Sequence, residues 1–161
     1  MTDNRRSALE ITTPSDREIV MTRVFDAPRA LVFKACTDPN AIPRWWGPSR
    51  YETTVDTMDV RPGGVWRFVS RGADGAEFAF NGVYREIVPT ERIVQTFEFE
   101  GMPGHISVDT MTLEEHDGKT TLTSTSLFDS VEDRDGMLHS GMEDGAAETY
   151  DRLEKLLGSM A

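Results

Sequence analysis

The sequence predicts an α+β protein in which a curved antiparallel sheet closes around one long C-terminal helix. Two patterns predict it. Residues 53–128 alternate polar and apolar side chains between turn signals, whereas residues 142–160 carry apolar side chains at the 3.6-residue period of a helix. Strands joined by short turns form a meander that coils as it twists, and an amphipathic helix must bury its stripe against such a sheet. We therefore expect an internal apolar pocket between the two.

The chain length favours a single folded unit. A length of 161 residues with 38% hydrophobic and 28% charged residues is typical of one globular domain. We expect residues 1–14 to form a polar tail with a short edge strand beginning near Leu9, and residues 15–161 to form the domain.

The first long strand is predicted over residues 18–25, where polar and apolar residues alternate. Residues 26–28 end this strand, because an aspartate caps helices and a proline suits the first helical turn. The following residues, 28–37, gather their apolar side chains on one side of a helix. A second short helix restarts at Asp38 and ends near Trp45.

The middle of the chain is predicted to be strands and tight turns. Asp74-Gly75 and Asp117-Gly118 are hairpin signatures, because these residue types tolerate positive φ. Gly82 interrupts an alternating run and predicts a bulge. The six strands are expected at 53–60, 65–71, 77–87, 92–100, 106–114 and 120–128.

In the last fifth of the chain the apolar residues change from the two-residue period of strands to the 3.6-residue period of a helix. Residues 130–141 form a charged connector with room for a helical turn, and the long helix follows from Met142. Acidic residues are frequent in the first half of that helix, and Arg152 and Lys155 come later, as the helix dipole favours. This helix is the strongest prediction from the sequence.

Charge and cysteine content exclude several classes of protein. The net charge is −11, so nucleic acid and anionic membrane surfaces are poor partners. Cys36 is the single cysteine, which precludes an intrachain disulfide and fits a reducing compartment. The sequence shows neither a signal-peptide pattern nor a transmembrane run. We expect a cytoplasmic protein.

Five segments together resemble a known family: residues 17–28, 37–48, 61–66, 82–94 and 141–156. They include the runs RVFDAP, RWWGP, RPGG and GVYREIVP. The chain is similar to the heat-shock-protein-90 ATPase activator-like family of the START-related superfamily, also called SRPBCC, which includes polyketide cyclases and birch-pollen-allergen-like proteins. The resemblance implies a helix-grip, START-like fold with a deep hydrophobic cavity between the sheet and the C-terminal helix.

The resemblance leaves the function open, because members include ligand carriers, cyclases, hydrolases and co-chaperone modules. Binding of a small hydrophobic or amphipathic ligand is our first hypothesis. The alternatives are a cyclase- or hydrolase-type enzyme using polar groups in the same pocket, and a regulatory module for a chaperone ATPase. A homodimer paired through the N-terminal edge strand is a further expectation about partners.

Aromatic side chains of the strands share one face, and with residues of the helices they are candidates for the pocket wall. Ordinary core packing is the competing interpretation. Because neighbouring residues on a helix point about 100° apart, one of the adjacent tryptophans should fill the core and the other should face the cavity mouth or a partner. The candidate lining residues are Trp45, Trp46, Trp66, Phe68, Phe78, Phe80, Tyr84, Phe97, Phe99, Met111, Met142, Ala146 and Tyr150.

We predict neither a catalytic constellation nor a metal or cofactor site. The three histidines, His105, His116 and His139, lack metal-ligand spacing, although His105 follows a Gly-rich loop from which it can reach a cavity entrance. No nucleophile motif surrounds the serines. The strand and helix carboxylates are interpreted as solvated: Glu98, Asp109, Glu114, Glu143 and Asp144.

Overall fold

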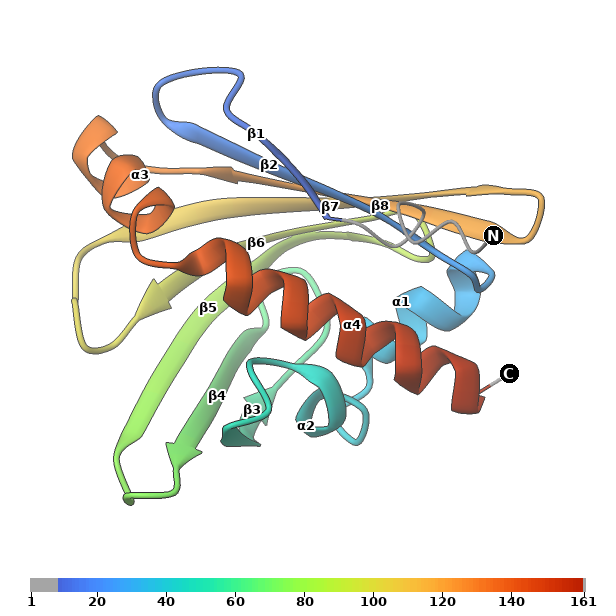
Figure 1. The fold of residues 1–161 in the computed structure, drawn as a ribbon, viewed down its shortest axis with the longest axis horizontal. Helices are drawn as coiled ribbons and strands as arrows, with labels where there is room; N and C mark the ends of the chain where they lie inside the picture. Colours follow the sequence, from blue (N-terminus) through green and yellow to red (C-terminus); the bar gives the residue numbers. More distant parts are fainter. Residues whose placement is uncertain (1–8, 161) are drawn as a thin grey trace.

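The computed structural model describes residues 9–160, which form a curved antiparallel sheet, one long helix and three short helices (Figure 1). The spatial order of the strands is β1-β2-β8-β7-β6-β5-β4-β3. Helix α4 crosses the concave side of the sheet. The predicted α+β helix-grip architecture is confirmed. The strands are β1 Glu10–Thr12, β2 Glu18–Phe25, β3 Tyr51–Met58, β4 Val65–Gly72, β5 Glu77–Val88, β6 Arg92–Phe99, β7 Ile106–His116 and β8 Lys119–Leu127.

The sheet bends at register shifts in two strands. One lies between Tyr84 and Glu86 of β5, and the other between Val55 and Thr57 of β3. The bulge expected at Gly82 therefore lies a few residues further along β5. Gly82 serves close approach instead, because a Cβ there would stand 1.9 Å from the Thr96 carbonyl oxygen.

Helices α1 (Arg29–Thr37) and α2 (Ile42–Trp45) follow β2, as predicted. The charged connector contains a full short helix, α3 (Val131–Leu138), rather than a single turn; the Ser130 side chain caps it by accepting from the Asp133 amide. Helix α4 (Met142–Met160) completes the chain. Among residues 9–160, no helix has both the length and the hydropathy to cross a membrane.

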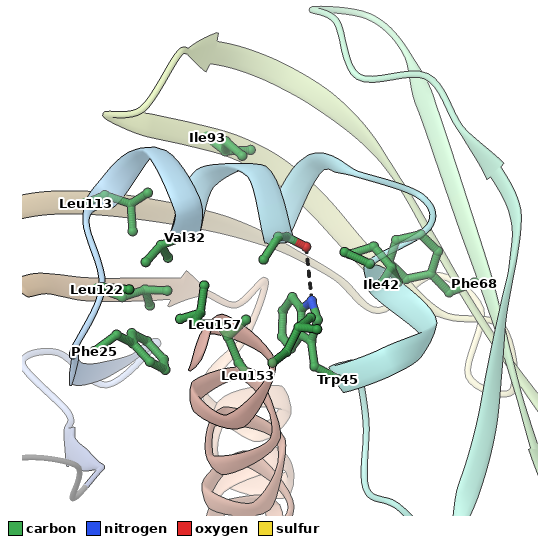
Figure 2. Packing of buried hydrophobic residues seen from close by; sticks show 14 of the residues in the cluster. Phe25, Val32, Ile42, Trp45, Phe68, Ile93, Leu113, Leu122, Leu153 and Leu157 are labelled. Atoms are coloured by element: carbon green, nitrogen blue, oxygen red, sulfur yellow. Dashed lines mark hydrogen bonds between the residues drawn. The ribbon is translucent and has the colours of Figure 1, made fainter. Parts of the chain in front are cut away.

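The main core lies under the C-terminal half of α4. Leu153 and Leu157 are almost fully buried and face Phe25 and Leu122 of the sheet, with Val32 of α1 closing the cluster (Figure 2). Each such side chain contributes about 1.5–3 kcal/mol on burial. This packing anchors one end of α4 and leaves the other end over the open part of the sheet.

Trp45 joins α2 to α1 through a hydrogen bond. Its indole Nε1–H donates to the Ala35 carbonyl at 3.0 Å, drawn as a dashed line in Figure 2. That carbonyl would normally accept from the residue four positions later, but Pro39 has no N–H. The tryptophan therefore satisfies an acceptor that the sequence itself leaves free.

Polar contacts fix α4 across the sheet. Arg23 of β2 is 2% exposed and places Nη1 3.1 Å from an Asp151 carboxylate oxygen. Arg152 donates from its guanidinium to the Gly47 carbonyl at 2.5 Å and to the Arg44 carbonyl at 3.1 Å. These contacts hold the helix to both β2 and the α2–β3 connection.

Candidate functional site

Three cavities are described below, and the largest of the three lies between the sheet and α3, with a volume of about 410 Å³. Phe80, Phe97 and Phe99 form its sheet wall because alternate residues of β5 and β6 face the concave side. Met137 of α3 lies on the opposite wall. The walls are mainly apolar, so this cavity suits an apolar molecule.

A hydrogen bond joins two residues that line this cavity. His105, in the loop between β6 and β7, places Nδ1 2.8 Å from Asp133 Oδ1 of α3. The same loop is held by the Gly104 amide, which donates to Glu98 at 2.7 Å. The predicted position of His105 at a cavity entrance agrees with this arrangement, since His105 lines the cavity.

A second cavity of about 330 Å³ opens between the α2–β3 connection and strands β4 to β6. Trp46 forms one side of it and packs edge-on against Phe80, with ring centroids 5.2 Å apart. Phe80 and Phe99 also line the first cavity, so the two hollows share a wall of aromatic rings.

A third, smaller cavity of about 160 Å³ lies beneath α4 and differs in chemistry. Tyr84, Gln95 and Asp109 line it, and they occupy one row across the sheet because Tyr84 pairs with Gln95 and Gln95 pairs with Asp109. Ser124 of β8 and Tyr150 of α4 complete the polar part of the lining. We call these five residues the polar floor.

Asp109 is the carboxylic acid of the polar floor. Burial raises its pKa from 3.8 to about 6, although hydrogen bonds from Ser126 and Ser107 act in the opposite direction. Ser107 Oγ donates to Asp109 Oδ1 at 3.2 Å. Asp109 is half-buried and lines the third cavity, so the carboxyl is available to that hollow.

The other ionisable groups of this lining are neutral near pH 7. Burial raises the pKa of Tyr84 and of Tyr150 well above the ordinary value for tyrosine. Burial also raises the pKa of the Cys36 thiol to about 12. Neither the thiol nor the phenols can therefore supply a charge to the cavity at that pH.

The structure places most of the predicted lining residues on cavity walls. Three of the predicted residues do not line a cavity. Trp66 is 1% exposed and packs in the core, with its ring centroid 4.9 Å from that of Phe68. Met142 and Ala146 line none of the three cavities. The residues on the walls are Trp45, Trp46, Phe68, Phe78, Phe80, Tyr84, Phe97, Phe99, Met111 and Tyr150. Trp45 also fills the core while Trp46 faces two cavities, as the helix geometry predicts.

The interpretation of Asp109 as a solvated carboxylate is wrong, because it lines the third cavity. The alternation of side chains along β7 is the signal in the sequence that places Asp109 on the inner face. Leu113 is 2% exposed, and residues at even spacing from it share its face: Ser107, Asp109 and Met111. Glu114, one position out of phase, is exposed.

The remaining predicted groups do not converge on the cavities. His116 and His139 are exposed. Across residues 9–160, no group of three or more His, Cys, Asp or Glu side chains is placed to hold a metal ion. The chemistry that the described cavities offer is therefore apolar contact, together with hydrogen bonding and proton exchange at the polar floor.

Comparison with known proteins gives one family. The model of the family described as Activator of Hsp90 ATPase homolog 1-like protein matches residues 26–158. A search of curated proteins gave no match.

Solved structures with this fold cover nearly the whole chain. A protein from Rhodobacter sphaeroides is 23% identical with a TM-score of 0.89, covering 94% of this chain and 98% of its own. A Chromobacterium violaceum protein is 28% identical with a TM-score of 0.79, covering 89% and 98%. CalU16 from Micromonospora echinospora is 25% identical with a TM-score of 0.61, covering 93% and 83%.

Proposed function

Because the chain belongs to the family of Activator of Hsp90 ATPase homolog 1-like proteins, within the START-related superfamily, we propose that it binds a small hydrophobic or amphipathic molecule between its sheet and its helices. Binding is proposed for the concave side of the sheet, where the cavities lie. The polar floor would orient the molecule, and the aromatic walls would supply most of the affinity.

The observation that carries this proposal is the cavity beneath α3. Its volume of about 410 Å³ falls within the range of roughly 300–1,000 Å³ that is usual for small-molecule sites. Phe80, Phe97 and Phe99 line it, and Met137 offers a side chain that adapts to different shapes.

Two measurements test binding. Native mass spectrometry of the purified protein asks whether it retains a molecule. Thermal melting with biphenyl, naphthols and medium-chain alcohols asks whether any of them stabilises the fold, and a ligand present at 100 times its Kd should add about 2.7 kcal/mol. A protein that retains nothing, and whose melting temperature is the same with every compound, would overturn the proposal.

A pair of variants on α3 locates the site. Met137→Glu places a charge on the apolar wall and should weaken binding at least about tenfold, since an unpaired carboxylate is expensive to desolvate. Val131→Glu makes the same change on the same helix at an exposed position that does not line the cavity, and should leave binding unchanged. Equal effects from both variants would place the ligand elsewhere.

Asp109 favours a second candidate function, acid–base catalysis on the bound molecule. A carboxyl whose pKa lies near 6 exchanges protons readily near neutral pH, and it lines a cavity of its own. Chromatography with mass detection, after incubation of a confirmed ligand with the protein, would show conversion. A ligand that is chemically unchanged after many hours would contradict catalysis and would leave the binding proposal in place.

A further inference from the structure

We propose that the polar floor selects the head group of the ligand: an uncharged or cationic group that donates a hydrogen bond to Asp109, such as an alcohol, a phenol or an amine, and not a carboxylate. This inference rests on the proposed binding function and adds the chemical class of the molecule. It also gives the bound molecule a direction, with its head beneath α4 and its apolar body beneath α3.

The inference begins with the row of side chains that the sheet register brings together. Tyr84, Gln95, Asp109 and Ser126 follow one another on β5, β6, β7 and β8 as direct cross-strand partners. Side chains opposite each other on neighbouring antiparallel strands have Cβ atoms about 4.5–5.5 Å apart. A head group above Asp109 is therefore within reach of Gln95 as well.

The acceptor of this row is the Asp109 carboxyl. Ser107 donates to one of its oxygens, Oδ1, at 3.2 Å. A carboxylate offers about four lone-pair sites on its two oxygens, so the hydrogen bonds from Ser107 and Ser126 leave capacity for a ligand. An incoming hydroxyl or ammonium group supplies the donor that such a carboxylate accepts.

The charges around the floor favour a donor over an anion. Asp109 is the only carboxylate among the described residues that line this cavity, and Tyr84, Tyr150 and Cys36 are neutral near pH 7. The nearby cation Arg23 already lies beside two carboxylates, with Nη1 3.1 Å from Asp151 and Nη2 3.7 Å from Glu154, which balance its charge. An anionic head would meet a like charge at Asp109, and no Lys, Arg or His side chain among residues 9–160 lines this cavity to offset it.

The apolar body of the ligand has room on the adjacent side. Ser107 lines the large cavity and donates a hydrogen bond to Asp109, which lines the small one, so residues two positions apart on β7 face the two cavities. Phe97, which pairs with Ser107 across the strands, contributes an aromatic wall there. A molecule with a polar end and an aromatic or aliphatic body matches this change from polar to apolar along the sheet.

Four probes of one shape test the inference: biphenyl, 4-phenylphenol, 4-phenylbenzylamine and biphenyl-4-carboxylate. Calorimetric titration at pH 7.5 measures the Kd of each for the whole protein. We expect the phenol and the amine to bind at least about tenfold more tightly than biphenyl, because hydrogen bonds to charged groups are the strong ones. The carboxylate should bind more weakly than biphenyl.

Substitutions of Asp109 separate the contribution of the ligand's head group to the affinity from that of its apolar body. Asp109→Leu should reduce the advantage of the phenol and of the amine over biphenyl to less than about threefold, whereas Asp109→Asn should keep much of the advantage of the phenol and lose that of the amine. Glu114→Gln removes a carboxylate from the exposed face of the same strand and should leave all four Kd values unchanged. The comparison of the four Kd values on the unaltered protein tests the inference by itself, even if a variant folds poorly.

The outcomes distinguish the two proposals. Binding of all four probes within about threefold of one another, or tightest binding of the carboxylate, would overturn the head-group inference while cavity binding stands. A preference for the phenol and the amine that survives in Asp109→Leu would also overturn it. If no probe binds, biphenyl included, then cavity binding of such molecules fails, and the inference fails with it.

Discussion

The ionisation of Asp109 should lower the stability of the folded protein, and replacing this residue by asparagine should remove that effect. Asparagine keeps the shape and the acceptor for Ser107 but carries no charge. The folded-state pKa of Asp109 is about 6 and the reference value is 3.8, so the native state binds the proton more tightly than the unfolded state. The unfolding free energy of the unaltered protein therefore falls as pH rises from about 4 to about 6, and this contribution is constant above that range.

The size of the effect follows from the pKa difference. At 1.36 kcal/mol per pKa unit, a shift from 3.8 to about 6 corresponds to roughly 3 kcal/mol at pH 7.5. The same linkage gives about 1.6 kcal/mol at pH 5.0, so about 1.4 kcal/mol develops between the two pH values. These figures are ceilings, because water entering the cavity solvates the ionised carboxyl.

Urea denaturation of Asp109→Asn and of the unaltered protein at pH 5.0 and pH 7.5 measures this difference. The stability advantage of the variant should widen by about 1 kcal/mol between pH 5.0 and pH 7.5. Glu114→Gln should show no such widening. An advantage that is independent of pH, or that narrows, would refute a raised pKa at Asp109.

Three further predictions concern packing and the cavity rim. Trp45→Phe leaves the Ala35 carbonyl without its donor and should destabilise the fold by about 2–3 kcal/mol in denaturant titration, and a change below about 0.5 kcal/mol would contradict the proposed role of this hydrogen bond. Gly82→Ala forces a Cβ against the Thr96 carbonyl and should cost more than about 3 kcal/mol, whereas Gly158→Ala, which meets nothing within 4 Å, should shift thermal stability by less than about 1 kcal/mol. His105→Ala removes the contact with Asp133 and should speed amide hydrogen exchange of α3 while changing global stability by less than about 1 kcal/mol; unchanged exchange would show that this contact does not hold α3.

The elements of the fold could be predicted because their signals are local. Alternation in strands, Asp-Gly at turns and the 3.6-residue stripe after Met142 each need only a short window of sequence. The same holds for the adjacent tryptophans, since helix geometry alone places Trp45 and Trp46 on different sides.

The site was harder to predict because it depends on which strands become neighbours. The row from Tyr84 to Asp109 exists only after β5, β6 and β7 pair in one register, and the bulge after Tyr84 alters the phase of β5. At Asp109 two signals conflict, because an acidic residue is usually solvated whereas the parity of β7 places this side chain on the concave face. The full length of α3 is not evident from the sequence, because the helix has few apolar residues and therefore shows no clear 3.6-residue period.

The buried side chains of α4 are Leu153, Leu156 and Leu157, all in the C-terminal half of the helix. Apolar burial therefore anchors the C-terminal half of α4, whereas the N-terminal half is held by polar contacts such as the hydrogen bonds from Ser49 to Glu148. A small shift of the N-terminal half would leave the three leucines packed, so this half is the part of the helix that can move at the lowest free-energy cost.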